Sequence, residues 1–241
     1  MTIALVDGDI VAYRCAASCE KKGIVSESLE VCLFRIDDLM TRILHETAAS
    51  SYVCFLTGSN NFRYKVNPEY KANRKDTPRP AYLQDAREYL ITHWKAKIED
   101  EQEADDAMGI YQTANENTII CTIDKDLLMI PGKHFNFVSG VFKDQSPLEG
   151  TRHFYWQLIM GDRTDNVMGF DGIARQTVPK KLEWAMAELQ DCQTEEAMFT
   201  LVQNMYNDDE RMLMSGQCLY IRKQEHEMWE FPKMNLMADE T

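Results

Sequence analysis

The sequence predicts an α/β fold, a mostly parallel sheet flanked by helices, from three apolar runs and the helical segments between them. Residues 3–6, 52–56 and 118–123 are short apolar runs, and each ends in a polar turn, as a buried strand would. Strands that alternate with helices favour a parallel sheet with helices on both faces. In such a sheet the loops that follow the strands form the ligand crevice, so we expect these polar turns to meet there.

Segments with helical spacing occupy the intervals around these strands. Apolar side chains recur at helical intervals over residues 10–20 and 29–48, and further helices are expected at about 80–95 and 103–114. After about residue 150 the strand signals fade, and helical segments rich in Leu, Met and Trp alternate with polar joints. This change from strand-like to helical sequence patterns predicts a second, helical part of the chain.

The chain of 241 residues is long enough for a substantial buried core. We expect a sheet-containing core over residues 1–155 and a helical part over residues 156–241, packed together as one unit. No stretch approaches the roughly 20 apolar residues that a membrane helix needs. The N-terminus has neither the basic start nor the long apolar segment of a signal peptide, which predicts a cytoplasmic protein.

The seven cysteines agree with a reducing compartment, because their number is odd and no Cys-x-x-Cys occurs. Cys15 and Cys19 lie one helical turn apart, a spacing that could suit zinc. The five histidines are scattered, however, and supply no second half for such a site. A zinc site is therefore not expected.

Acidic residues occur in four segments that the predicted fold could bring together. They are Asp7, after the first strand; Glu103, Asp105 and Asp106, at a helix start; Asp124 and Asp126, after the third strand; and Asp162 and Asp165. On a helix Glu103 and Asp106 share a face, whereas Asp105 points about 100° away. Asp162 and Asp165 would share a face if that segment were helical.

Each acidic segment also has a structural explanation, because acids cap helix starts and Asp is common in turns after strands. These explanations do not predict acids at two strand ends together with acid pairs on two later helices. Clustered carboxylates repel one another and become tolerable when divalent cations neutralise them. All-oxygen ligands favour Mg²⁺ or Mn²⁺ over zinc. Two such ions, roughly 4 Å apart, support phosphodiester hydrolysis.

Other chemistries have less support in the sequence. There is no Gly-x-Ser-x-Gly nucleophile motif, no Walker loop and no Gly-x-Gly-x-x-Gly dinucleotide motif.

The net charge of −13 argues against a nucleic-acid partner until its distribution is considered. Residues 63–79 carry six basic side chains against two acidic ones, and tyrosines are interleaved with them. Basic residues with aromatics suit phosphate contacts and stacking on an unpaired base. The alternative is a solvated basic loop without a ligand.

The motifs occur in the order found in a known superfamily. They are Val6-Asp7-Gly8; Phe62-Arg63 with Pro68-Glu69-Tyr70-Lys71-Ala72-Asn73-Arg74; Glu103-Ala104-Asp105-Asp106; Asp124-Lys125-Asp126; and Gly161-Asp162-x-x-Asp165-Asn166. Residues 3 to about 180 resemble the FEN-like 5′-nuclease superfamily. This superfamily includes bacteriophage 5′→3′ exonucleases and the 5′-nuclease domain of bacterial DNA polymerase I. The Asp7-Gly8-Asp9 motif near the start of the sequence and the compact size resemble most those of a phage replication exonuclease.

The resemblance implies a PIN-like core, a basic arch over about residues 62–90, and a helix–three-turn–helix hairpin over about residues 161–182 that grips DNA. It implies two metal ions, Mg²⁺ or Mn²⁺. Asp7, Glu103, Asp105 and Asp106 would gather around one, and Asp124, Asp126, Asp162 and Asp165 around the other. Lys71 and Arg74 would contact the scissile phosphate. Further DNA contacts would come from Arg63, Lys65, Tyr70 and Lys75 in the arch and from Gly172, Ile173, Arg175, Lys180 and Lys181 in the hairpin, where K⁺ could bind.

Three positions depart from the family pattern. Relatives carry an aspartate after the second strand, where this sequence has Gly58, so one carboxylate of the first metal group is missing unless water or Asp9 replaces it. Ala174 and Gln176 stand where relatives usually carry Gly and Lys, which weakens the expectation of a cation in the hairpin.

The combined expectation is a metal-dependent 5′→3′ exonuclease acting on duplex DNA, with flap endonuclease and RNase H-like primer-removal activity. Its partners would be duplex DNA with a 5′ end or flap, RNA–DNA hybrids and replication proteins, with no membrane; a phage enzyme would work in the host cytoplasm. The oligomeric state stays open. One alternative is a non-catalytic protein that binds DNA ends or flaps, and another is a PIN-type ribonuclease.

Overall fold

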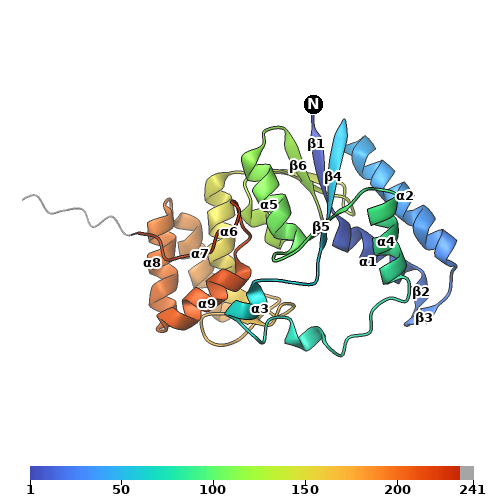
Figure 1. Cartoon of the computed structure of the whole chain (residues 1–241). Helices are drawn as coiled ribbons and strands as arrows, with labels where there is room; N and C mark the ends of the chain where they lie inside the picture. The colour runs from blue at the N-terminus through green and yellow to red at the C-terminus, as the bar shows by residue number, and fades with distance from the viewer. Residues whose placement is uncertain (234–241) are drawn as a thin grey trace, which may run out of the picture.

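A six-stranded sheet forms the centre of the molecule in a computed structural model that describes residues 1–233 (Figure 1). The strand order is β5-β4-β1-β6-β7-β8. The strands are β1 (Ile3–Asp7), β4 (Ser51–Thr57), β5 (Lys97–Glu99), β6 (Thr118–Cys121), β7 (Gly132–Asn136) and β8 (Val141–Gln145). All neighbours are parallel except β7 and β8. The three strands predicted from the sequence are therefore confirmed, and they form the middle of the sheet.

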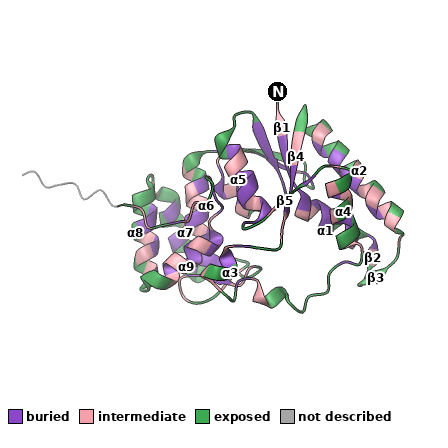
Figure 2. Ribbon diagram, viewed as in Figure 1, coloured by how far each residue is buried: buried purple, intermediate pink, exposed green. Residues whose placement is uncertain are grey.

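Helices cover both faces of the sheet, as predicted. The helices α1 (Gly8–Ser18), α2 (Leu29–Glu46) and α4 (Leu83–Thr92) share one buried cluster with Ala4 and Val6 of β1. The alternate residue Leu5 belongs to a second cluster, with α5 (Ala104–Ala114) and α6 (Pro147–Met160). This alternation follows from the period of two along a strand. Figure 2 shows the buried strands enclosed between the two helical layers.

The C-terminal part is helical and continues the second cluster. Three helices, α7 (Glu183–Asp191), α8 (Glu195–Tyr206) and α9 (Asp209–Leu219), pack against α6. The same cluster contains Leu5 of the sheet, Met198 of α8 and Trp229. The expected boundary near residue 155 falls within α6, and the expected helical part includes residues 234–241, which lie outside the described residues.

Short elements connect these layers. They are β2 (Glu20–Lys21), β3 (Ile24–Val25), β9 (Gly161–Asp162), β10 (Val167–Met168), α3 (Arg63–Val66) and the 3₁₀ turns η1 (Ala72–Arg74), η2 (Asp126–Met129) and η3 (Lys180–Leu182). Within residues 1–233 no helix is both long and apolar enough to cross a membrane.

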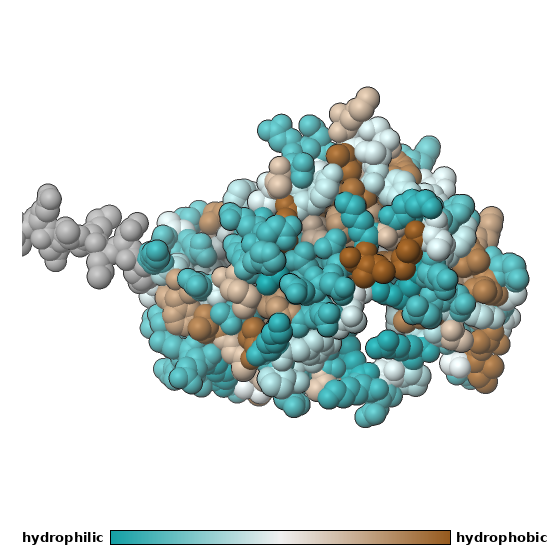
Figure 3. Space-filling model, viewed as in Figure 1, coloured by the Kyte–Doolittle hydropathy of each residue, from teal (hydrophilic) through white to brown (hydrophobic). Residues whose placement is uncertain are grey.

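Residues 67–82, which we name the bridge segment, run from α3 on one side of the molecule to α4 on the other (Figure 1). An opening lies between this segment and the body of the protein in Figure 3. The far end is held by the chain around β2 and β3, because the backbone N–H of Ala81 donates to Glu20 at 2.6 Å and the hydroxyl of Tyr82 donates to the Glu27 carbonyl at 3.3 Å. The basic part of the sequence therefore spans the carboxyl edge of the sheet.

Candidate functional site

Asp7 lies at the carboxyl end of the central strand and is 2% exposed. One carboxylate oxygen accepts the N–H of Ile10 at 3.0 Å, which caps α1. The other accepts the hydroxyl of Thr122, at the end of the neighbouring strand β6, at 2.6 Å. Burial raises the pKa of Asp7 to about 7, and the nearby Asp9 and Asp124 add repulsion. Asp7 is thus a fixed acid at the point where β1 and β6 end.

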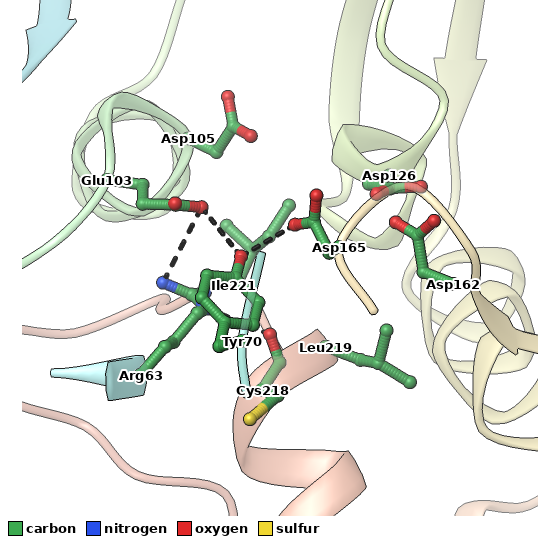
Figure 4. A pocket seen from close by; sticks show the side chains of 10 residues that line it. All are labelled: Arg63, Tyr70, Glu103, Asp105, Asp126, Asp162, Asp165, Cys218, Leu219 and Ile221. Atoms are coloured by element: carbon green, nitrogen blue, oxygen red, sulfur yellow. Dashed lines mark hydrogen bonds and ion pairs between the residues drawn. The ribbon is translucent and has the colours of Figure 1, made fainter. Parts of the chain in front are cut away.

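The start of α5 places its three acids differently. Glu103 is the N-cap residue, and its backbone N–H donates to Asp106 at 3.0 Å in a reciprocal capping box. Asp105 lines the crevice together with Glu103 (Figure 4). Burial, with repulsion from Asp7 and Asp124, raises the pKa of Asp105 well above its usual range. Glu103 and Asp105, rather than Glu103 and Asp106, therefore face the other acids.

Asp106 is fully buried and paired with Arg63. The guanidinium of Arg63 donates to both carboxylate oxygens, at 2.6 and 2.9 Å, and to the carbonyls of Cys218 and Tyr220 at 2.8 Å each. The N–H of Arg222 donates to Asp106 at 3.1 Å. Burial alone would raise the pKa of Asp106, but Arg63 holds it below its usual value. The expected metal ligand Asp106 and the expected DNA contact Arg63 instead neutralise each other inside the protein, because a buried charge needs a partner.

The acids after β6 and α6 complete the crevice. Asp124 accepts the N–H of Asp126 at 2.9 Å, and Asp126 accepts the side-chain amide of Gln157 from α6 at 2.6 Å. Asp162 belongs to the short strand β9, and Asp165 follows in a turn, so their segment is not the helix that would put them on one face. Burial raises the pKa of Asp124, Asp126 and Asp162, with repulsion between these acids as a further cause.

The bridge segment closes over this crevice. Lys71 contacts Glu103 closely and lies 3.4 Å from Asp165, and Arg74 lies 2.5 Å from the same aspartate. The hydroxyl of Tyr70 donates to Asp165 at 2.6 Å and also lies 3.1 Å from Glu103, as Figure 4 shows. The cavity that Tyr70 lines together with acids of the crevice, among them Glu103 and Asp165, measures about 20 Å³, the space of a single water. Tyr70 is 2% exposed, so its ring is not a free stacking platform in this arrangement.

The donor chemistry of the crevice fits hard divalent cations. Seven carboxylates converge there: Asp7, Glu103, Asp105, Asp124, Asp126, Asp162 and Asp165. Five of these have a pKa that burial raises first of all, with repulsion from neighbouring acids as a further cause. Among residues 1–233, however, no three acid, His or Cys side chains are already arranged to hold a metal ion. Lys71 and Arg74 supply positive charge instead.

Gly58 lies where a further carboxylate was missing. A Cβ atom there would come 2.7 Å from the carbonyl oxygen of Glu99 and still closer to the carboxylate of Asp100. Asp9 is not free either, because it accepts the N–H of Thr57 at 2.9 Å and is paired with Arg87 of α4. The space beside Gly58 is therefore already filled by the end of β5.

Residues 161–182 do not form the expected helix–three-turn–helix hairpin, because they consist of the strand pair β9 and β10, turns and the 3₁₀ turn η3; they still present some of the expected contacts. Gly172, with φ of +76°, and Ile173, which is 50% exposed, lie on the surface, as do Lys180 and Lys181. Arg175 is not free, because its guanidinium is paired with Asp171 and donates to the carbonyl of Ile173 at 3.1 Å. Lys65 in α3 and Lys75 in the bridge segment are exposed.

Several contacts that shape the site have no distinct signal in the sequence. Thr122, Gln157 and Arg87 each bind an acid, yet all three come from elements predicted only for their helical or strand pattern. The position of Thr122, two residues before Asp124 at a strand end, is the one signal that could have identified it.

The chain is similar in sequence to known exonucleases and DNA polymerases. Residues 2–153 match the family described as "5'-3' exonuclease, N-terminal resolvase-like domain". The chain is 26% identical to DNA polymerase I of Bacillus caldotenax over 255 residues, covering 92% of this chain and 28% of that protein. It is 27% identical to the exodeoxyribonuclease of Enterobacteria phage T3 over 191 residues, covering 70% of this chain and 63% of that protein. The chain thus spans less than two thirds of the length of these relatives.

A solved structure shares the fold. The bacteriophage T5 D15 flap endonuclease, crystallised with DNA and metal ions, superposes with a TM-score of 0.68 at 16% identity, over 91% of this chain and 89% of that one. The α/β fold with a C-terminal helical region is therefore the FEN-like fold that the sequence predicted.

Proposed function

We propose that this chain, which belongs to the 5′–3′ exonuclease family with an N-terminal resolvase-like domain, is itself a metal-dependent 5′→3′ exonuclease that hydrolyses phosphodiester bonds at the 5′ ends of duplex DNA. The observation that carries the proposal is the convergence of seven carboxylates beneath a basic bridge segment. Flap cleavage is part of the same proposal, since the T5 relative is a flap endonuclease. Primer removal from RNA–DNA hybrids is proposed with it, on the family resemblance of the motifs alone.

Two groups of acids would hold Mg²⁺ or Mn²⁺. Asp7, Glu103 and Asp105 form the first group, without Asp106. Asp124, Asp126, Asp162 and Asp165 form the second. Bound ions would activate water for attack and stabilise the leaving oxygen. The protein's contribution is to fix the acids: Thr122 orients Asp7 and Gln157 orients Asp126.

Lys71 and Arg74 would act on the scissile phosphate. Both pair with acids of the crevice, Lys71 with Glu103 and Arg74 with Asp165, so a phosphodiester bound at these acids would also meet the two cations. Cationic donors at that place stabilise the charge that develops on the phosphoryl oxygens. The opening beneath the bridge segment (Figure 3) offers a path for a single strand, and exposed Lys65 and Lys75 would attract its backbone.

The surface around residues 161–182 would hold the duplex. Exposed Gly172 and Ile173 offer backbone contacts, and Lys180 and Lys181 add positive charge for phosphates without reading sequence. A K⁺ ion at these residues is part of the proposal. Arg175 is left out, because Asp171 already neutralises it.

The test uses 5′-labelled and 3′-labelled duplex, flap substrate, RNA–DNA hybrid and single-stranded RNA, each with Mg²⁺, Mn²⁺ or EDTA. We expect metal-dependent release of short products from the 5′ label, and loss of cleavage in Asp126→Asn by at least about 100-fold, of the order seen when one catalytic electrostatic group is removed. Asp191→Asn, at an exposed site at the end of α7, is the matched control. Binding without cleavage would identify an end-binding protein, and cleavage confined to RNA a ribonuclease.

A further inference from the structure

The bridge segment makes several polar contacts with the loop that carries Asp165. Besides the side chains of Tyr70 and Lys71, which contact the Asp165 carboxylate, five polar contacts join residues 69–74 to residues 163–166: Lys71 N–H to the Asp165 carbonyl (2.9 Å), Asn73 amide to the Arg163 carbonyl (2.7 Å), Arg74 Nε to the Thr164 carbonyl (2.9 Å), Arg74 to the Asp165 carboxylate (2.5 Å), and Asn166 amide to the Glu69 carbonyl (2.8 Å). Residues 69–74 are thus docked on one edge of the acid crevice.

Within this docked segment, Lys71 reaches into the crevice. Its ammonium group bridges Glu103 and Asp165, which belong to the two different acid groups, and Tyr70 bridges the same pair through its hydroxyl. The side chain of Lys71 is 19% exposed, and its backbone has a φ of +55°, a conformation that non-glycine residues rarely adopt. The surrounding contacts therefore hold Lys71 in a position that its own backbone disfavours.

We propose that residues 69–74 form a latch in which the Lys71 ammonium occupies the place of a divalent cation between Glu103 and Asp165, so that metal binding and latch closure exclude each other. Two observations favour competition. The Lys71 ammonium contacts Glu103 and lies 3.4 Å from Asp165, so it occupies the space between these two carboxylates that a cation would need. Each carboxylate that Lys71 and Tyr70 engage is also one that the proposed metal sites require.

Opening of the latch would free Lys71 and Arg74 for the phosphate of a substrate. The inference rests on the proposed function, because that function places the metal ions at these acids. Because only molecules with an open latch can bind metal, the apparent affinity for metal is reduced in proportion to the fraction of molecules that are open. Lys71 and Arg74 would then neutralise Glu103 and Asp165 before a metal ion binds, and would contact the substrate phosphate afterwards.

The first measurement is Mg²⁺ binding by titration calorimetry without DNA. Lys71→Met keeps the length of the side chain but removes the ammonium, so we expect it to bind Mg²⁺ about tenfold more tightly than the wild type, a change of about 1.4 kcal/mol. Lys75→Met removes a positive charge from an exposed site on the same segment and is the matched control. It should change the affinity by less than about twofold, the scale of a screened surface charge.

The second measurement is amide hydrogen exchange of a peptide covering residues 69–75, with and without Mg²⁺. Metal binding usually protects a site, but an opening latch should exchange faster, because the Lys71 N–H loses the Asp165 carbonyl. Equal affinities in the two Met variants, protection of this peptide by Mg²⁺, or no Mg²⁺ binding at all would each overturn the latch. Metal-dependent cleavage in the labelled-substrate assay would still support the nuclease, so the two proposals fail separately.

Discussion

The ion pair between Arg63 and Asp106 gives the sharpest prediction about stability. Asp106 is 0% exposed and Arg63 is 2% exposed, and they share two hydrogen bonds of 2.6 and 2.9 Å. In Asp106→Asn the charge disappears and an NH₂ group must face donors, which are the Arg63 guanidinium and the backbone N–H groups of Glu103 and Arg222. The buried guanidinium is then left without its counter-charge.

Breaking a buried pair by removing one partner costs about 3–5 kcal/mol. The unfolding free energy of a typical domain is about 5–15 kcal/mol, so this loss is a large fraction of the total. Arg63 also ties α3 to the end of α9 through the carbonyls of Cys218 and Tyr220. We therefore expect Asp106→Asn to reduce the midpoint of urea unfolding strongly, and Arg63→Met to do so by a similar amount.

The assay compares urea unfolding of the two single variants with that of Arg63→Met/Asp106→Asn in EDTA. The double variant should be much more stable than the sum of the two single losses implies, because residues in direct contact are not additive. Asp105→Asn, one residue away, is the control, and it should be neutral or stabilising without metal, because the pKa of Asp105 is raised well above its usual range. A change below about 1 kcal/mol in Asp106→Asn, together with loss of Mg²⁺ binding, would refute the reasoning and restore Asp106 as a metal ligand.

Three further predictions concern other parts of the site. Because the pKa of Asp7 is raised from its usual value to about 7, metal-free protein should lose stability as pH rises from 4 to 7, by up to about 4 kcal/mol, and Asp7→Asn should flatten that slope in urea unfolding at each pH. Arg87→Met should cost about 1–3 kcal/mol by the same method, and adding Asp9→Asn should then cost little more. Gly58→Ala should cost about 1–3 kcal/mol, with only partial rescue by Asp100→Gly, because the backbone oxygen of Glu99 also lies too close.

The sequence predicted the centre of the fold because that part is buried. Strands β1, β4 and β6 are continuous apolar runs, as strands covered on both faces must be. Strands β5 and β8 lie at the edges and are mostly exposed, so their residues carry no apolar pattern. For the same reason the number of strands could not be read from the sequence.

The sequence predicted which acids lie in the candidate site better than it predicted the residues with which those acids pair. The neighbouring strands β1 and β6 are parallel, so the turns that follow them lie at the same edge of the sheet. This is why Asp7, Asp124 and Asp126 lie close together, as expected. Spacing within a motif does not say which member points into the crevice. Glu103 at an N-cap is not yet on the helix, so the angular rule that paired it with Asp106 did not apply.

The pairing of Arg63 and Asp106 also has a consequence for charge around the proposed metals. In this chain with a net charge of −13, three of the six bases of residues 63–79 are paired with acids: Arg63 with Asp106, Lys71 with Glu103 and Arg74 with Asp165. The Arg63 and Lys71 pairs differ in burial. The first pair is fully buried and is held by further backbone contacts. The second is partly exposed, on a strained residue of a segment held by polar contacts. Of the two, only the Lys71 pair can be exchanged for a divalent cation, so substitution of Lys71 should change metal affinity and substitution of Arg63 should change stability.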